Sequence, residues 1–424
     1  MRELWRRIKE GLADMCYIWA KEMRTTFTDE GVLIFFILVP LLYPLLYSWV
    51  YNNQVVREVP VVAVDLSHSH MSRQFLRQFD ASPDVRVAYY AGSLEEARDL
   101  MAKQIVNGVV LVPSDFDLRL NRMEQTSVSV YCDMALMLTY KAINQTAVAV
   151  ATDINRQIQV KLSGNMTDRE DEVTIQPLDF DEVPIFSPTG GYGDFIIPGV
   201  LMLIIQQTLL LGIGLGAGTA RETNRYRDLV PVSRHYNGIF RIVFGKSLCY
   251  LMIFAVMSAY LILAVPRIFG FIAIGDARAL LGLMFPYLLA CIFFGMMLSC
   301  LVRYRENVLL LVVFTSVPFL FLSGISWPQS NIPGAWQGVS VLLPSTFGVR
   351  GFVRINSMGA TLSDIQQEYQ ALWIQTTAYF FVTCLVYRFQ INQAHQHAHE
   401  RIQHLKDKAT QARLFLMKKE KSDK

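Results

Sequence analysis

Six long apolar runs constrain this chain more than any other feature of its sequence. A helix needs about 20 apolar residues to cross the hydrocarbon core of a bilayer. Six stretches reach or nearly reach that length: Gly31–Tyr51, Phe195–Thr219, Phe240–Val265, Ala279–Val302, Val308–Gly324 and Ala371–Tyr387. Backbone groups in lipid must form their hydrogen bonds within the chain, so such runs fold as helices. The sequence therefore predicts six transmembrane helices, the last two of them slightly short.

The composition agrees with a membrane protein and argues against other classes. Hydrophobic residues make up 52% of the 424 residues and charged residues only 18%, whereas soluble proteins carry about a quarter charged residues. The net charge of +3 is small, and aromatic residues do not interleave with basic ones, so we expect no nucleic-acid partner.

Metal ligands are sparse in the sequence. None of the six cysteines forms a CxxC pair, so a zinc or redox site is not expected. His68 and His70, near Asp65, and the tail histidines at 395, 397 and 399 are the candidate ligands. A solvated turn is the more common structure for such groups, and the sequence predicts no metal site.

The distribution of lysine and arginine sets an orientation for the predicted spans. Basic residues concentrate on the cytoplasmic side of membrane proteins. Here they collect in the first 30 residues, in the loop after the second run, in the link after the fourth and in the tail. All four lie on one side if both termini are cytoplasmic. The first run, about 21 residues, is too long for a cleavable signal, so we expect a permanent anchor and residues 52–193 outside the cytoplasm.

Residues 52–193 carry the alternating strand and helix patterns of a small α/β domain. Strands are predicted at Val59–Asp65, Val85–Tyr90, Gly108–Val112 and Val128–Cys132, and helices at Ser69–Phe79, Ser93–Ile105 and Ala135–Leu162. Ser93 followed by Glu96 is a capping pattern, and the acidic stretch 168–182 is predicted to be extended. The predicted fold class is a mainly α membrane protein with six transmembrane helices and an inserted extracytoplasmic α/β domain.

Other segments complete the predicted organisation. Residues 1–30 repeat apolar residues at helical spacing, which predicts an amphipathic helix on the inner surface, or alternatively one packed in a cytoplasmic unit. Residues 194–388 hold the second to sixth spans. Within them, prolines break 325–355 into pieces that fit short re-entrant helices. Residues 389–424 form a basic cytoplasmic tail.

Polar and small residues inside the second run are the candidate functional positions in the membrane. Gln206, Gln207 and Thr208 lie mid-span, where polar side chains either line a pathway or hydrogen-bond between helices. We weigh these two interpretations equally. Alternating glycines form small-xxx-small pairs, which favour close helix packing, with a flexible point as the alternative: Gly212, Gly214, Gly216 and Gly218.

One segment imitates a nucleotide-binding motif. Residues 244–247 read Phe-Gly-Lys-Ser, like the end of a phosphate-binding loop, but the upstream glycine that this loop requires would fall at Phe240. The chain therefore lacks a nucleotide-binding loop of that kind. We expect Lys246 to anchor the third span at the inner interface instead.

Taken in order along the chain, several short segments resemble the permease subunits of type-2 ABC exporters, in the bacterial branch with a large outer domain between the first two spans. The resemblance covers essentially the whole chain. It is carried by Lys21-Glu22-Met23-Arg24, Phe195-Ile196-Ile197-Pro198-Gly199, Arg221-Glu222 with Pro231 and Gly245-Lys246, and Leu322-Ser323-Gly324 with Trp327-Pro328, Pro333 and Leu343-Pro344-Ser345-Thr346. One departure is that Asn224 and Arg225 stand where the family carries Gly-Thr.

The resemblance implies a function and its partners. Two permease chains, as a homodimer or with a related paralogue, would form the conduit in the bacterial inner membrane. Separate ATPase subunits would bind ATP and magnesium, so this chain would need no cofactor and have no catalytic residue. A periplasmic adaptor is a further candidate partner. The residues that would couple to the ATPase are Lys21, Glu22, Arg221, Glu222, Pro231 and Lys246.

Two other functions compete with this interpretation. A membrane receptor would use residues 52–193 as its sensor, but it usually carries an intracellular output domain, and residues 389–424 are too few for one. A membrane-embedded enzyme would need clustered acids, histidines or nucleophiles, which the spans lack. The exporter permease is therefore the main hypothesis.

Overall fold

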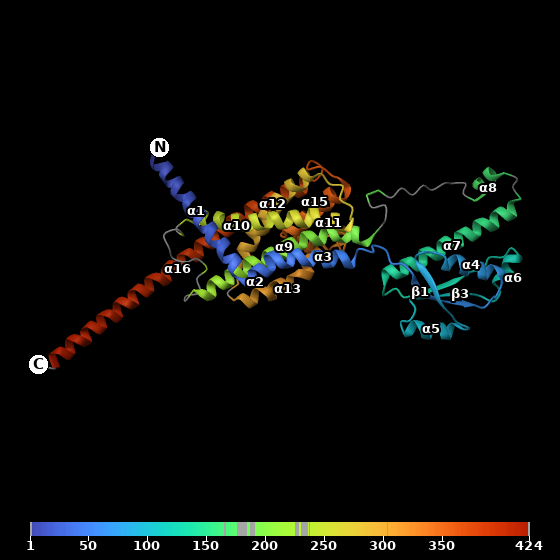
Figure 1. Cartoon of the computed structure of the whole chain (residues 1–424), viewed down its shortest axis with the longest axis horizontal. Coiled ribbons are helices and arrows are strands. Elements are labelled where there is room, and N and C mark those ends of the chain that lie inside the picture. Colours follow the sequence, from blue (N-terminus) through green and yellow to red (C-terminus); the bar gives the residue numbers. More distant parts are fainter. Residues whose placement is uncertain are drawn as a thin grey trace. The chain divides into compact units, whose positions relative to one another are not determined.

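The computed structural model of the chain (Figure 1) describes residues 2–164, 167–175, 185–186, 191–224, 229, 236, 238–302 and 304–422. The chain divides into two compact units. One contains Met1–Asn52 and Ile185–Lys424, and the other is Asn53–Pro184. Each unit has hydrophobic clusters of its own.

Five helical segments of the first unit are long and apolar enough to cross a membrane, among the residues described. The first span is Glu30–Val50, formed by α2 (Glu30–Leu33), the π-helical turn η1 (Ile34–Leu38) and α3 (Val39–Val50). The second is α9 (Tyr192–Thr223), and the third joins α10 (Ile239–Ala259), η3 (Tyr260–Ala264) and α11 (Val265–Phe269). The fourth is α12 (Ala277–Ser299) and the fifth α13 (Arg305–Leu322).

The sixth predicted run, Ala371–Tyr387, lies inside α16 (Gln366–Ser422) and is not among these five. Polar residues dilute its hydropathy, among them Gln375, Thr376 and Thr383. The two threonine hydroxyls donate to carbonyl oxygens of α12, Thr376 to Pro286 and Thr383 to Phe293, at donor–acceptor distances of 3.0 Å. This part of α16 thus packs against the fourth span with its polar groups satisfied.

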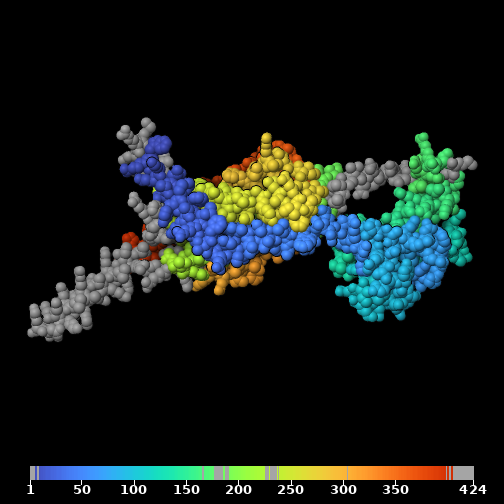
Figure 2. All heavy atoms as spheres, viewed as in Figure 1, coloured from blue at the N-terminus to red at the C-terminus, as the bar shows by residue number. Residues whose placement is uncertain are grey.

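Helix α9 is the most buried of the five spans and forms the centre of the unit. Figure 1 shows α9 running through the bundle beside α3, α12 and α13. The Tyr287 hydroxyl of α12 donates to the Met202 carbonyl of α9 over 2.7 Å. The first and third spans lie beside each other on the face seen in Figure 2, where the Tyr260 hydroxyl donates to the Leu41 carbonyl.

The remaining helices of this unit are α1 (Arg2–Thr28), the short η4 (Gln329–Asn331), α14 (Gly334–Ser340) and α15 (Pro344–Met358). The sequence predicts short re-entrant pieces over 325–355, and the helices of that stretch are η4, α14 and α15. Helix α15 starts at a proline and ends at Gly359, whose positive φ of 68° closes the helix. One face of α15 is buried against α9 and α12.

The second unit is built on a mixed sheet of four strands in the order β2-β1-β3-β4. Strand β1 (Val59–Asp65) is parallel to β2 (Val85–Tyr90) and β3 (Gly108–Val112), and β4 (Ser129–Cys132) is antiparallel to β3. The first three strands begin and end where the sequence predicts. Their helices are α4 (His70–Asp80), α5 (Leu94–Ala102), α6 (Phe116–Asn121), α7 (Met137–Ser163) and α8 (Asp168–Ile175).

Both faces of this sheet are covered, as the apolar run of β1 requires. Val61 of β1 packs in a cluster with Phe75 of α4 and Ile143 of α7. Val62, the next residue, points to the other face and packs with Ala97 of α5. Successive residues of a strand face opposite sides, so both must be apolar here.

The acidic stretch of this unit differs from its prediction. The sequence predicts extended chain over 168–182, whereas Asp168–Ile175 is helical and 176–182 lie outside the described residues. Acidic side chains stabilise the first turn of a helix, where backbone N–H groups are unpaired. Thr167 supports this start, since its hydroxyl accepts from the Glu170 amide. The acidic residues therefore mark the start of a helix.

Candidate functional site

A buried ion pair joins helix α1 to α10. Both carboxylate oxygens of Glu22 accept hydrogen bonds from Lys246 Nζ at 2.8 Å, and the Tyr250 hydroxyl also donates to Glu22. Lys246 is only 8% exposed. The sequence predicts Lys246 as an anchor of the third span at the inner interface. Within the chain it is buried, and Glu22 supplies the opposite charge that burial requires.

Two further contacts extend this junction along α1. Arg241 of α10 forms an ion pair with Asp14, and Ile18 is fully buried against Gly245, where an added Cβ would come within 3.0 Å of Ile18. Residues 244–247 thus belong to a helix and not to a loop, so they cannot cradle a phosphate. Helix α1 is packed on the bundle through both charged and apolar side chains.

A second charged node joins the first, second and fifth spans through Asp29. This residue caps α2, accepting from the Gly31 amide at 3.0 Å. It also accepts from the Thr219 hydroxyl of α9 and from Arg305 Nη2 of α13, both at 2.7 Å. Burial raises the pKa of the Asp29 carboxyl. The hydrogen bonds that it accepts from Thr219 and Val32, together with the charge of Arg305, outweigh burial, so this pKa lies below its ordinary value.

The end of α9 contacts this node and its surroundings through two charged residues. Glu222 accepts from the Arg305 amide at 3.1 Å, at the first residue of α13. Arg221 is buried and donates to the carbonyl oxygens of Cys300, at 2.9 Å, and Val302, which follow α12. The two residues therefore tie α9 to the start of one span and the end of another.

The other predicted coupling residues are placed as follows. Lys21 lies over the Tyr236 ring, with Nζ 5.2 Å from the centroid. Pro231 and Arg225 lie outside the described residues. The structure thus brings Glu22 together with Lys246 in the first node and places Glu222 beside Arg305 of the second.

The polar residues within α9 have different surroundings. Gln206 is fully buried, and its Oε1 lies 3.8 Å from Cys291 Sγ of α12, while Nε2 has no hydrogen-bond partner in the part of the chain that the structure describes. Both amide atoms of the partly exposed Gln207 lack a partner among the described residues. Thr208 donates to the Ile204 carbonyl of its own helix at 2.6 Å. Gln207 is the only one of the three that is partly exposed, and its two amide atoms are themselves buried.

The glycines of α9 meet two different spans. Gly212 faces Phe36 of the first span, where a Cβ would lie 1.9 Å from the ring. Gly214 and Gly218 face α13, where a Cβ would approach Val308 within 2.5 Å and the Arg305 backbone within 2.9 Å. At Gly216 the nearest atom is 3.8 Å away. Three of the four positions therefore have no room for a side chain.

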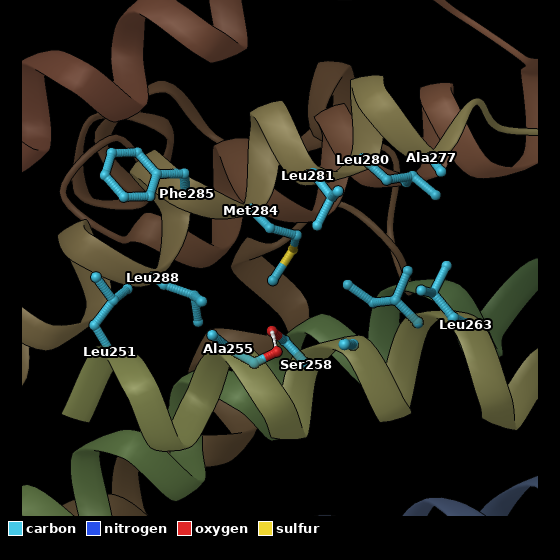
Figure 3. Close-up of a pocket in the computed structure, with 12 residues that line it drawn as sticks. Leu251, Ala255, Ser258, Leu263, Ala277, Leu280, Leu281, Met284, Phe285 and Leu288 are labelled. Carbon is cyan, nitrogen blue, oxygen red and sulfur yellow. Dashed lines mark hydrogen bonds between the residues drawn. The ribbon is translucent and has the colours of Figure 1, made fainter. Parts of the chain in front are cut away.

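An apolar groove lies between α10 and α12 (Figure 3). Its volume is about 230 Å³. Side chains of the two helices point toward each other across it, and Leu281 at its edge is 64% exposed. The hydroxyl of its one serine, Ser258, donates to the Ala255 carbonyl. Such a lining can hold hydrocarbon but neither a metal nor a nucleotide.

Sequence reasoning missed the partners that complete both nodes. Asp29 and Arg305 each lie at the start of a span, and a charged residue at the edge of an apolar run could have indicated them. No such pattern in the sequence indicates Tyr250, Asp14 or Arg241. No group of three or more His, Cys, Asp and Glu side chains suited to a metal occurs in the part of the chain that the structure describes.

The family comparison agrees with this architecture. The sequence model of the ABC-2 family transporter proteins matches residues 31–385. The match covers most of the chain, and the chain therefore belongs to the ABC-2 transporter family. Its members are membrane subunits of ABC transporters that work with ABC ATPases and are generally not catalytic themselves, so this is a multi-pass membrane protein. No curated protein matches the chain.

Proposed function

We propose that this chain is the transmembrane subunit of an ATP-driven ABC exporter. Two such chains, identical or paralogous, form the substrate conduit, and separate ATPase subunits bind ATP and magnesium. The chain itself carries no cofactor. The family match supports the transporter class, and the observation that carries the export mechanism is the pair of charged nodes, one joining α1 to α10 and the other joining the start of the first span to α9 and α13.

These nodes are suited to transmit a movement of α1. A displacement of α1 would move α10 through the Glu22–Lys246 ion pair. It would also move the first span directly, because Asp29, which caps α2, follows the end of α1. Asp29 in turn contacts α9 through Thr219 and α13 through Arg305, so both helices would follow. Close-packed interiors transmit strain because they resist compression. An ATPase bound to α1 and the loop after α9 would therefore act on four spans together.

The proposed topology follows the basic residues. Both termini and the two nodes lie in the cytoplasm, the membrane is the bacterial inner membrane, and residues 52–193 form an extracytoplasmic domain. Ala371–Tyr387 of α16 crosses as the sixth span, supported by its packing on α12 with Thr376 and Thr383 bonded to carbonyl oxygens. The short helices of 325–355 re-enter the outer leaflet.

We assign the second permease chain to the exposed face of α13 and the neighbouring face of α9. Phe314 of α13 is 77% exposed and Val313 is also exposed. Gln207 on α9 is partly exposed, but both of its amide atoms are buried and have no partner among the described residues. A polar side chain in a span needs a protein or water contact, so Gln207 would have to turn outward to meet a facing chain or a conduit. Gln206 and Thr208, its neighbours in the sequence, are buried.

Co-purification tests the proposal. The full chain, extracted in mild detergent with its native partners, should bring down an ATP-hydrolysing subunit, and Glu222→Lys should leave ATP hydrolysis intact while reducing transport. Glu222 is exposed, so this variant should fold. A preparation free of any ATPase would favour the receptor function, and transport unchanged in Glu222→Lys would remove that residue from coupling.

A further inference from the structure

A second cavity lies at the opposite end of α9 from the charged nodes. It has a volume of about 230 Å³ and is bordered by the start of α9, the end of α13, α15 and the start of α16. Phe195 on its rim and Arg221 are 26 residues apart on one helix, which places them roughly 40 Å apart at 1.5 Å per residue. This cavity is therefore remote from the coupling site.

Three charged side chains line this cavity, and one of them is unmatched. Arg354 donates to both oxygens of Glu368, at 3.0 and 3.2 Å, and to the Asp364 carbonyl at 2.9 Å. Arg350, one turn earlier on α15, forms no hydrogen bond or ion pair with any described residue. The nearby carboxylate of Asp364 bonds to Thr361 and also interacts electrostatically with Arg354. Arg354 therefore has two carboxylates beside it, whereas Arg350 has only the charge of Glu368, whose oxygens Arg354 already binds.

The surroundings of Arg350 favour an anion. Burial lowers the pKa of its guanidinium, and the charge of Glu368 acts in the opposite direction. A guanidinium has five donors in a planar fork, and a partly buried charge is usually paired. The guanidinium of Arg350 therefore has donors that an anionic acceptor could bind.

The walls of the cavity indicate what carries that anion. Phe195 is 59% exposed, while Ile325 and Val349 form the inner wall. Phe195 lies in the first turn of α9, the second span, so we expect the rim near the surface of the membrane. A ligand that satisfies both parts has an anionic head and an apolar body.

We propose that this cavity binds the phosphate headgroup of an anionic phospholipid, with Arg350 on the phosphate and the acyl region against Phe195. The lipid would brace α15 against the start of α9. The inference depends on the membrane location and not on the proposed transport function. Failure of the ATPase test would therefore leave it standing.

The experiment is a titration of the purified full chain in neutral detergent. Phosphatidylglycerol, phosphatidylcholine and inorganic phosphate are added separately, and the thermal midpoint is followed. Phosphatidylglycerol should raise the midpoint most. Arg350→Gln should weaken the apparent affinity for it about tenfold or more, as expected for a lost charge-assisted hydrogen bond. Arg278→Gln, an exposed arginine of α12 that does not line the cavity, is the matched control and should respond like the unaltered chain.

A second variant protects the test against a folding defect. Phe195→Ala changes an exposed side chain and should weaken phosphatidylglycerol binding while leaving all charges in place. Equal responses of the unaltered chain and Arg350→Gln to phosphatidylglycerol would overturn the proposal. If inorganic phosphate raised the thermal midpoint as much as phosphatidylglycerol does, the site would bind a free anion, and the proposal of a phospholipid ligand would be wrong.

Discussion

The two units of this protein use charged residues in opposite ways. In the second unit the ion pairs lie at the surface, such as Lys103 with Asp99, whose side chains are 66% and 77% exposed. In the membrane unit the Glu22–Lys246 pair is 16% and 10% exposed. Exposed pairs contribute at most about 1 kcal/mol, whereas breaking a buried pair leaves a charge without a partner. The sheet is therefore held by its apolar faces, whereas the junction of α1 with α10 contains a buried charge pair besides its apolar contacts.

The largest test of this contrast is Lys246→Met. It leaves the Glu22 carboxylate buried without its partner, which should destabilise the chain by about 3–5 kcal/mol. Thermal unfolding in detergent measures the loss. The double variant with Glu22→Leu removes both charges and should regain most of the stability. If the double variant were as unstable as the single one, the charge would not be the cause.

The Asp29 node should have the next largest effect. Asp29→Asn removes a charged acceptor of several hydrogen bonds, and the expected loss is about 1.5–3 kcal/mol. The pKa of Asp29 lies below its ordinary value of 3.8. Its stabilising contribution is therefore complete above pH 3.8 and is lost as the pH falls through the lowered value. Unfolding midpoints should fall with acid in that window for the unaltered chain, and less steeply for Asp29→Asn; parallel curves would contradict this assignment.

Glycine packing along α9 gives a third, smaller effect. Gly218→Val places a Cβ within 2.9 Å of the Arg305 backbone, and such overpacking costs about 1–3 kcal/mol. Gly216→Ala, at a position whose nearest neighbour is 3.8 Å away, is the control and should change the midpoint little. Equal effects of the two substitutions would show that α9 and α13 do not approach as closely as described.

The smallest effect is expected in the second unit. Arg119→Ala removes an ion pair with Asp115 whose nitrogen and oxygen are 2.6 Å apart but whose side chains are 49% and 43% exposed. Water screens such a pair, so the loss should stay below about 1 kcal/mol. The free energy of unfolding of this unit, obtained from chemical denaturation of the full chain, measures this loss. A loss as large as that of Lys246→Met would break the comparison between the two units.

Local pattern was enough to predict the elements of this protein but not the junctions between them. The apolar run Val59–Asp65 is bounded by polar residues and turned out to be β1, and the first five spans follow from length and hydropathy alone. Glu22 and Lys246 are 224 residues apart in the sequence, and no periodicity connects them. The same holds for Asp29 and Arg305.

Some predictions failed or stay open because composition alone does not decide them. The acidic stretch beginning at Asp168 is polar, which is typical of extended linkers, yet its charges suit a helix start. The run Ala371–Tyr387 carries threonines whose hydroxyls find acceptors only when α12 is placed beside them. Whether Gln206 and Gln207 border a conduit depends on a second chain, and its position is not encoded in local pattern.

The π-helical turn η1 takes up one extra residue in the first span. This wide turn holds one more residue than an α-helical turn, and it lies between Asp29 and α3. Removing one residue within Ile34–Leu38 would convert it to an ordinary turn and leave Asp29 beside Thr219 and Arg305. Adding one residue there would instead rotate everything before it by about 100° relative to α3 unless a second wide turn formed. The first span should therefore tolerate a one-codon deletion in η1 better than a one-codon insertion.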